Sequence, residues 1–150
     1  MLEPRISPTL PDWIKDHLTR YLATDGEDGY LWDSAFGGGE GMVTTLLLST
    51  VGRRSGVTLT LPLIFGETAT GYAIIASKGG APAHPAWFLN LEAQPEVTVQ
   101  IKGETFTATA RVVEGAERET IWKMMQGIYA PYDSYQAATE RLIPVVVLER

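Results

Sequence analysis

The chain has 150 residues and a formal net charge of −6, with 45% hydrophobic and 20% charged residues. This length and composition are typical of one globular domain, and the acidic balance disfavours binding to nucleic acid phosphates. The absence of cysteine excludes disulfides and cysteine nucleophiles, and His17 and His84 are too few and too far apart to predict a metal site or a catalytic relay. No stretch is long and apolar enough for a signal peptide or a spanning helix, which predicts a cytoplasmic protein.

The N-terminal part of the chain predicts one helix followed by a loop. Apolar residues recur at helical spacing at Trp13, Ile14, Leu18, Tyr21 and Leu22. Residues 24–41 are rich in glycine and acids and follow no period, which predicts an irregular connection. We therefore expect a single domain over residues 1–150, with a variable helix and loop in residues 1–41 and a barrel in residues 42–150.

The middle of the chain predicts strands. Residues 43–50, 57–65 and 72–77 are runs of β-branched and apolar residues separated by turns that contain glycine. Pro62 lies inside the second run, and because proline has no N–H to donate, that strand is predicted to be an edge, bulged or broken there.

The second half of the chain predicts a short helix after Pro85, a hairpin over residues 96–113, a helix over residues 114–128 and a last strand after Pro144. The count is about six strands with three or four helices, joined mostly by turns of hairpin length. Short connections favour antiparallel pairing, so we predict a mainly β (α+β) antiparallel barrel with peripheral helices, and not a doubly wound parallel sheet.

The first candidate site is the turn at residues 51–56, VGRRSG, which places Arg53, Arg54 and Ser55 between two glycines. Glycines let backbone N–H groups converge on an anion, and guanidinium groups bind phosphate or carboxylate through two parallel hydrogen bonds. The alternative is a basic turn that is simply solvated. The turn lacks the Gly-Lys-Ser/Thr ending of a Walker A loop.

The second candidate site is the segment at residues 77–90, where a strand ends in Ser77 and Lys78, two glycines follow, and Pro85 precedes a helix. Free amides beside a helix N-terminus favour negative charge, although the glycines alone also suit a tight loop with a solvated lysine. Two cationic turns on an acidic protein predict one elongated anion that touches both. Trp87 and Phe88 are expected in the core, unless one of them walls a flat ring.

The third candidate is a group of tyrosines that recur every three residues, Tyr129, Tyr132 and Tyr135. On a helix these phenols lie near one another, and one of them is a candidate proton donor at a pocket. Packing against the barrel is the alternative. No pair of carboxylates has a spacing that predicts an acid and base couple.

The ordered segments TTLLLSTVGRRSG, ASKGGAPAHPAWFLNLEAQPEVTVQ and YAPYDSYQAATERLIPVVVLE resemble the deazaflavin-dependent nitroreductase and quinone reductase family, whose members use coenzyme F-420. The resemblance runs from about residue 44 to residue 150. It implies a split β-barrel that binds a deazaflavin. It also implies an enzyme that passes a hydride from the reduced cofactor to a quinone, an activated alkene or a nitroaromatic compound.

The resemblance also implies roles for individual residues. Arg53, Arg54 and Ser55 would hold the phosphate and glutamate tail of the cofactor. Tyr132 would stand over the ring, where it or Ser77 would stabilise charge on the substrate or relay a proton. The groove and the ring and ribityl site would be lined by Leu61, Pro62, Leu63, Ile64, Ile75, Ala76, Ser77, Lys78, Ala86, Trp87, Phe88 and Asn90. Leu59 and Ile64 depart from the arginine and the aromatic residue that many relatives carry, which affects the expected tail and substrate contacts.

Other readings of the sequence remain open. A split barrel with similar basic turns can hold FMN instead, and a protein that only binds or carries the cofactor would show the same turns. Peripheral membrane contact through the N-terminal helix is a further possibility, which its charged residues, such as Asp12 and Asp16, disfavour. We expect a monomer or a homodimer.

Overall fold

The computed structural model describes residues 1–150 and folds most of them around one antiparallel sheet. The strands are β1 (Leu31–Asp33), β2 (Met42–Val51), β3 (Thr58–Ile64), β4 (Gly66–Glu67), β5 (Gly71–Ile75), β6 (Glu96–Ile101), β7 (Glu104–Val112) and β8 (Val145–Glu149). The helices are α1 (Asp12–Thr24), α2 (Ala86–Ala93), α3 (Gly115–Ile128) and α4 (Pro131–Ala137), with short 3-10 helices η1 (Ser34–Gly37) and η2 (Lys78–Gly80). None of the helices combines the length and the apolar character needed to cross a membrane.

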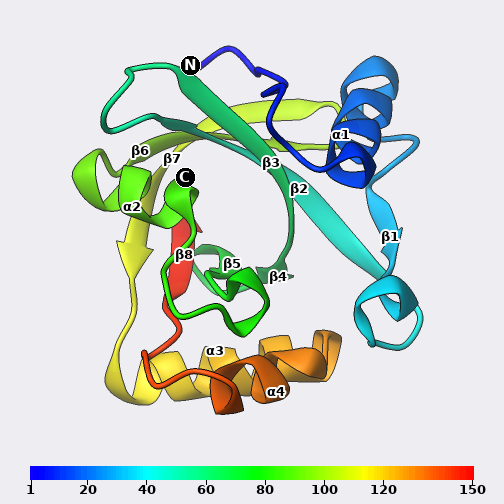
Figure 1. Ribbon diagram of the computed structural model, residues 1–150. Helices are drawn as coiled ribbons and strands as arrows, with labels where there is room; N and C mark the ends of the chain where they lie inside the picture. Colours follow the sequence, from blue (N-terminus) through cyan, green and yellow to red (C-terminus); the bar gives the residue numbers. More distant parts are fainter.

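The strands form a split barrel with helices around it (Figure 1). The sheet order is β1-β2-β6-β7-β8-β5-β4, with β3 on β2 as well, and every pair is antiparallel. This confirms the predicted fold class. The irregular connection expected over residues 24–41 is wrong in part, because β1 and η1 lie within it. These elements and β4 are too short to carry a period that a sequence pattern can reveal.

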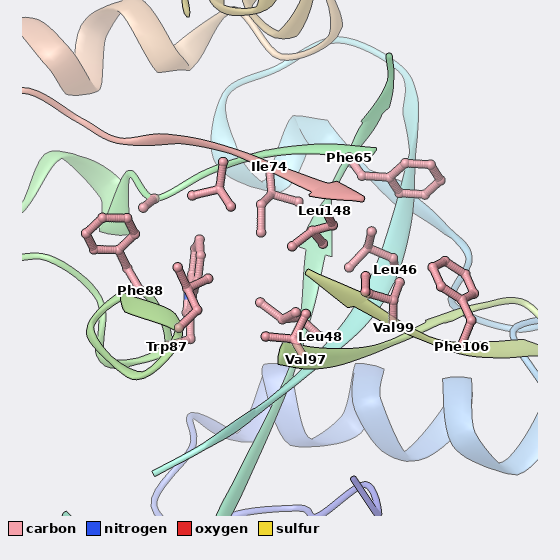
Figure 2. Packing of buried hydrophobic residues seen from close by; sticks show 14 residues of the cluster. Leu46, Leu48, Phe65, Ile74, Trp87, Phe88, Val97, Val99, Phe106 and Leu148 are labelled. Atoms are coloured by element: carbon pink, nitrogen blue, oxygen red, sulfur yellow. The ribbon is translucent and has the colours of Figure 1, made fainter. Parts of the chain in front are cut away.

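The core occupies the inside of the barrel, and several strands are buried on their outer face as well. In β8, Val146 and Leu148 face the interior cluster, while Val145 and Val147 face α3 and α4. The strand is therefore apolar at every one of these positions, as expected where both faces are covered. Figure 2 shows the interior cluster, to which β2, β5, β6, β8 and α2 contribute side chains.

Pro62 lies in a continuous strand, and the pairing register explains why. Phe65 N donates to Thr44 O, so alternate residues of β3 point their N–H groups toward β2, and the position of Pro62, opposite Leu47, points its nitrogen away. The missing N–H therefore removes no bond from the β2–β3 ladder. Because β3 pairs only with β2, the predicted edge strand is confirmed, without a break at the proline.

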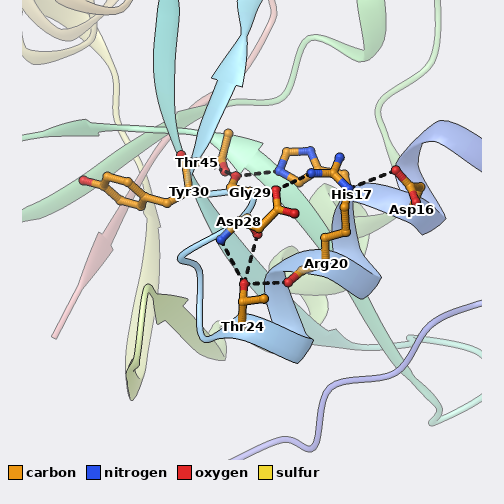
Figure 3. Close-up of polar contacts among 8 residues, drawn as sticks. All are labelled: Asp16, His17, Arg20, Thr24, Asp28, Gly29, Tyr30 and Thr45. Atoms are coloured by element: carbon orange, nitrogen blue, oxygen red, sulfur yellow. Dashed lines mark hydrogen bonds and ion pairs between the residues drawn. The ribbon is translucent and has the colours of Figure 1, made fainter.

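The helix α1 packs on the outside of β2 through a small buried cluster that includes Leu18 and Tyr21. The Tyr21 hydroxyl donates to Thr45 O at 3.0 Å, and burial raises the pKa of this phenol to about 12. His17 is also buried, and its Nε2 atom lies 2.7 Å from Gly29 O (Figure 3). Gly29 has φ +116°, and a Cβ atom there would lie 3.1 Å from the His17 ring. The ring therefore fixes the course of the chain between α1 and β1.

Acid should weaken the folded protein through His17. Burial of the ring lowers its pKa from 6.5, so below that pH the unfolded chain takes up a proton that the folded chain does not. We expect the free energy of unfolding to fall as the pH drops from about 6.5 toward the lowered pKa. The carboxyl groups of Glu117 and Glu149, whose pKa lies below 4.5, lose their charge only at lower pH.

The measurement is thermal or urea unfolding between about pH 7.5 and 5.5, for the natural chain and for His17→Gln. Glutamine can also donate to Gly29 O but does not titrate, so the variant should show the flatter pH profile. Equal slopes for both proteins would show that His17 has no part in the acid sensitivity.

Candidate active site

The turn between β2 and β3 carries two arginines, and hydrogen bonds close the backbone at its base. Gly52 N donates to Val57 O at 2.9 Å, and Val57 N donates to the Ser55 hydroxyl at 3.1 Å. Gly56, with φ +71°, takes the left-handed conformation that the turn needs. Arg53 and Arg54 are exposed at the tip, and neither pairs with a carboxylate. The turn thus presents two guanidinium groups whose charge no carboxylate neutralises.

Asn90 joins this turn to α2. Its Oδ1 atom accepts hydrogen bonds from Arg53 N at 3.1 Å and from Arg53 Nη1 at 3.2 Å, and its Nδ2 atom donates to Thr50 Oγ1 at 3.2 Å. Asn90 is only 3% exposed, so the side chain is buried with both ends of its amide satisfied. It therefore fixes where the Arg53 guanidinium lies relative to the helix.

A cavity of about 250 Å³ opens beside the turn. Its lining consists of Arg5, Gly52, Arg53, Arg54, Ser55, Val57, Thr58, Leu59, Ala86 and Asn90. Three arginines and no acidic residue line this space, on a chain whose net charge is −6. The donor set therefore suits an anion with several charged oxygens. The sequence predicted five of these residues as cofactor contacts, namely Arg53, Arg54, Ser55, Ala86 and Asn90, but not Arg5.

The second cationic turn, η2, has an unusual backbone. Lys78, Gly79 and Gly80 all have positive φ, at 46°, 63° and 81°. A Cβ atom on Gly80 would lie 2.7 Å from Tyr135 O, so only glycine fits against α4. The backbone N–H groups of Ser77, Lys78 and Gly79 make no hydrogen bond within the protein. Free N–H groups on a turn of this kind form an anion-binding concavity.

Arg141 holds this second turn from behind. Its guanidinium donates to Ser77 O at 2.7 Å, to Ala81 O at 2.8 Å and to Ala76 O at 3.3 Å. It also lies 2.9 Å from His84 Nδ1, and because arginine can only donate, that nitrogen is the acceptor. No carboxylate pairs with Arg141, and burial lowers its pKa. The turn therefore directs its carbonyls toward Arg141.

Sequence reasoning did not single out Arg141. Its partners at residues 76–84 lie about sixty positions earlier in the chain, since the bonds to Ala81 and Ser77 span 60 and 64 residues. The only signal was its place in the segment ATERLIPV, which belonged to the family resemblance without a role for the arginine.

The three predicted tyrosines do gather into one cluster. Ring centroids are 5.0 Å apart for Tyr129 and Tyr132, 6.2 Å for Tyr129 and Tyr135, and 6.3 Å for Tyr132 and Tyr135. The Tyr129 hydroxyl bonds to that of Tyr135 at 3.0 Å and donates to Gly37 O at 2.9 Å. The Tyr132 hydroxyl has no hydrogen bond with another residue, and burial raises the pKa of this phenol, which keeps it protonated.

The other predicted lining residues do not all share one surface. Leu61 and Leu63 pack on the interior cluster, whereas Ile64 packs on the helix-side cluster, because neighbours along a strand face opposite ways. Ala76 and Ile75 divide in the same manner. The aromatic pair expected in the core or at the ring lies in the interior cluster, with Trp87 5% and Phe88 3% exposed. Pro62 and Lys78 are accessible. Ala86, the first residue of α2, lines the cavity beside the β2–β3 turn, whereas no residue of η2 does.

Solved structures of related chains agree with this arrangement. A structure of an F-420-H2-dependent reductase is 44% identical, covers 70% of this chain and 93% of its own, and gives a TM-score of 0.65. A structure described as a domain-swapped dimer is 39% identical, covers 95% of this chain and 100% of its own, and gives a TM-score of 0.68. The fold and these likenesses place the chain among the split-barrel oxidoreductases.

The chain belongs to the F-420H(2)-dependent quinone reductase family, whose pattern matches residues 13–150. An F-420H(2)-dependent quinone reductase of Mycobacterium tuberculosis is 36% identical over 140 residues, which are 91% of this chain and 89% of the relative. The resemblance drawn from residues 44–150 is thereby confirmed, and it extends to the N-terminal helix.

Removing the Arg141 side chain should loosen the η2 turn specifically. Arg141→Met leaves three carbonyls without their charged donor, so we expect the free energy of unfolding to fall by about 2 kcal/mol. Amide hydrogen exchange should quicken at residues 76–81 and stay unchanged in the β6–β7 hairpin. Arg20→Met, which breaks only exposed ion pairs with Asp16 and Asp28, serves as the control and should cost less than about 1 kcal/mol. Uniform loss of protection along the chain would contradict a local role.

Proposed function

We propose that this chain is an oxidoreductase that uses reduced coenzyme F-420 to reduce quinones. The family match over residues 13–150 carries this conclusion. The cavity beside the β2–β3 turn supports it independently, because its arginines suit the phosphate and carboxylates of such a cofactor. Activated alkenes and nitroaromatic compounds are proposed as further substrates, since they are electron-poor in the same way as quinones.

The proposed cofactor site joins the two cationic turns across the start of α2. Arg53, Arg54 and Ser55 bind the charged tail, and Asn90 keeps the Arg53 fork in place. The free amides of Ser77 and its two neighbours, together with the Lys78 ammonium, bind oxygens nearer the ring. When bound in its reduced form, the deazaflavin supplies a hydride equivalent for the reduction. The chain itself binds, orients and neutralises charge.

Tyr132 is the proposed proton donor. Its phenol is 5% exposed, stays protonated because burial raises its pKa, and has no partner within the protein. A hydroxyl in that state can donate to a substrate oxygen as negative charge develops there. Ser77 is a second candidate for the same task. Tyr135 lies closer to the η2 turn along the backbone, but its hydroxyl is already bonded to that of Tyr129.

Optical titration tests the function. We expect the purified protein to quench the fluorescence of oxidised F-420 saturably, and to oxidise the reduced cofactor when a soluble quinone is added. Binding of FMN with no binding of the deazaflavin would instead establish an FMN enzyme. Tight deazaflavin binding without turnover of a quinone, an enone or a nitroaromatic compound would establish a carrier protein.

Replacing Tyr132 with Phe should lower turnover at saturating cofactor by about tenfold or more, with little change in cofactor affinity. Folding should be unaffected, because no hydrogen bond within the protein is lost. Tyr129→Phe is the matched control, since it removes bonds to Gly37 O and to Tyr135 and should cost about 1 kcal/mol of stability. Equal losses of turnover and of cofactor affinity in Tyr132→Phe would rule out the proton-donor role.

Self-association and peripheral contact with a membrane stay predictions for this chain.

A further inference from the structure

The first eleven residues form a strap without regular secondary structure across the outside of the barrel, and a turn at residues 8–10 leads from it into α1 (Figure 1). Leu2 N donates to Thr98 Oγ1 on β6 at 2.7 Å, and Arg5 N donates to Thr60 Oγ1 on β3 at 3.0 Å. Both threonines are buried, at 4% and 0% exposure. The strap is therefore fixed at two points to the sheet, on either side of β2.

A row of hydroxyl groups on the sheet provides these fixed points. Ser49 on β2 lies opposite Thr60 in the β2–β3 register and opposite Thr98 in the β2–β6 register. The Ser49 and Thr60 hydroxyls are 2.7 Å apart. These hydroxyl side chains face outward toward the strap, and two of them accept hydrogen bonds from its backbone. The sheet thus sets the position of the Arg5 backbone.

Arg5 lines the cavity that Arg53 and Arg54 also line. None of these three arginines pairs with a carboxylate, whereas the arginines on α1, on β7 and at the C-terminus each do. Like charges that converge without a counter-ion repel one another unless an anion is present. The strap therefore adds a third arginine without a carboxylate partner, from a part of the chain distant in sequence from the β2–β3 turn.

We propose that Arg5 is a binding residue for the carboxylate tail of the deazaflavin, and that it makes affinity depend on that tail. The proposal rests on the proposed function. A ligand with several spaced carboxylates can reach the strap and the turn together, and each guanidinium can take one carboxylate through two hydrogen bonds. The ring portion of the cofactor has no such groups, so its binding should not depend on Arg5.

The test compares two ligands in a fluorescence titration: F-420 with its glutamate tail, and the deazaflavin core that lacks phosphate and glutamates. In Arg5→Gln we expect affinity for the tailed cofactor to fall about tenfold at low salt, and affinity for the core to stay the same. The difference should shrink as salt is added. Lys123→Gln, an equal charge change on the exposed face of α3, should leave both affinities unchanged.

A second variant tests the strap itself. Thr60→Val removes the acceptor for Arg5 N, and should also weaken only the tailed ligand. Equal weakening of tailed and core ligands in Arg5→Gln, or no weakening at all, would overturn the proposal. If neither deazaflavin binds the natural chain, the proposed function fails. Titration with free oligo-γ-glutamate then tests the role of Arg5 separately. Binding to the natural chain that is lost in Arg5→Gln supports this role, and no binding to the natural chain overturns it.

Discussion

Burial of β5 and β8 on both faces is the constraint on which the rest of the structure depends. Ile74 and Leu148 fill the barrel, and Ile75 and Val147 on the opposite faces need a cover of their own. The helices α3 and α4 provide it. Since α4 must lie on that face, its tyrosines come to rest against η2, where Gly80 leaves room for the helix backbone. Packing on the outside of the sheet thereby shapes the candidate active site.

Charge is distributed unevenly over this framework. Arg20, Arg111 and Arg150 each pair with a nearby carboxylate, but Arg53 and Arg54 at the β2–β3 turn, Lys78 at η2 and Arg5 on the strap do not, although the chain is acidic overall. Arg141 is a separate case, because its charge is met by backbone carbonyls. Arg141 bonds the carbonyl oxygens of the η2 turn, while the N–H groups of Ser77, Lys78 and Gly79 in the same turn stay without a partner in the protein. A half-buried cation can in this way prepare an anion site that it does not touch.

The sequence predicts what depends on local pattern and misses what depends on distant contacts. The strands, the antiparallel class and the tyrosine cluster follow from spacings of two or three residues, and the structure has them. Arg5 and Arg141 act on segments far along the chain, with Arg5 bonded 55 residues away, so no local motif reveals them. The expected groove residues on β3 are divided between the two faces of the strand. Residues that are adjacent in a sequence motif point to opposite faces of the strand, so the motif alone does not tell which of them line the groove.

Pro62 has a consequence for the protein in concentrated solution. An exposed edge strand is a template on which another chain can add, and such growth leads to fibres. On β3 the outward nitrogen of Pro62 carries no hydrogen, and Thr60, on the same strand, is already engaged by the strap. An incoming strand would therefore lack a donor at one position and meet an obstacle two residues away. The exposed edge at β3 can therefore remain accessible to a ligand without promoting the addition of further chains.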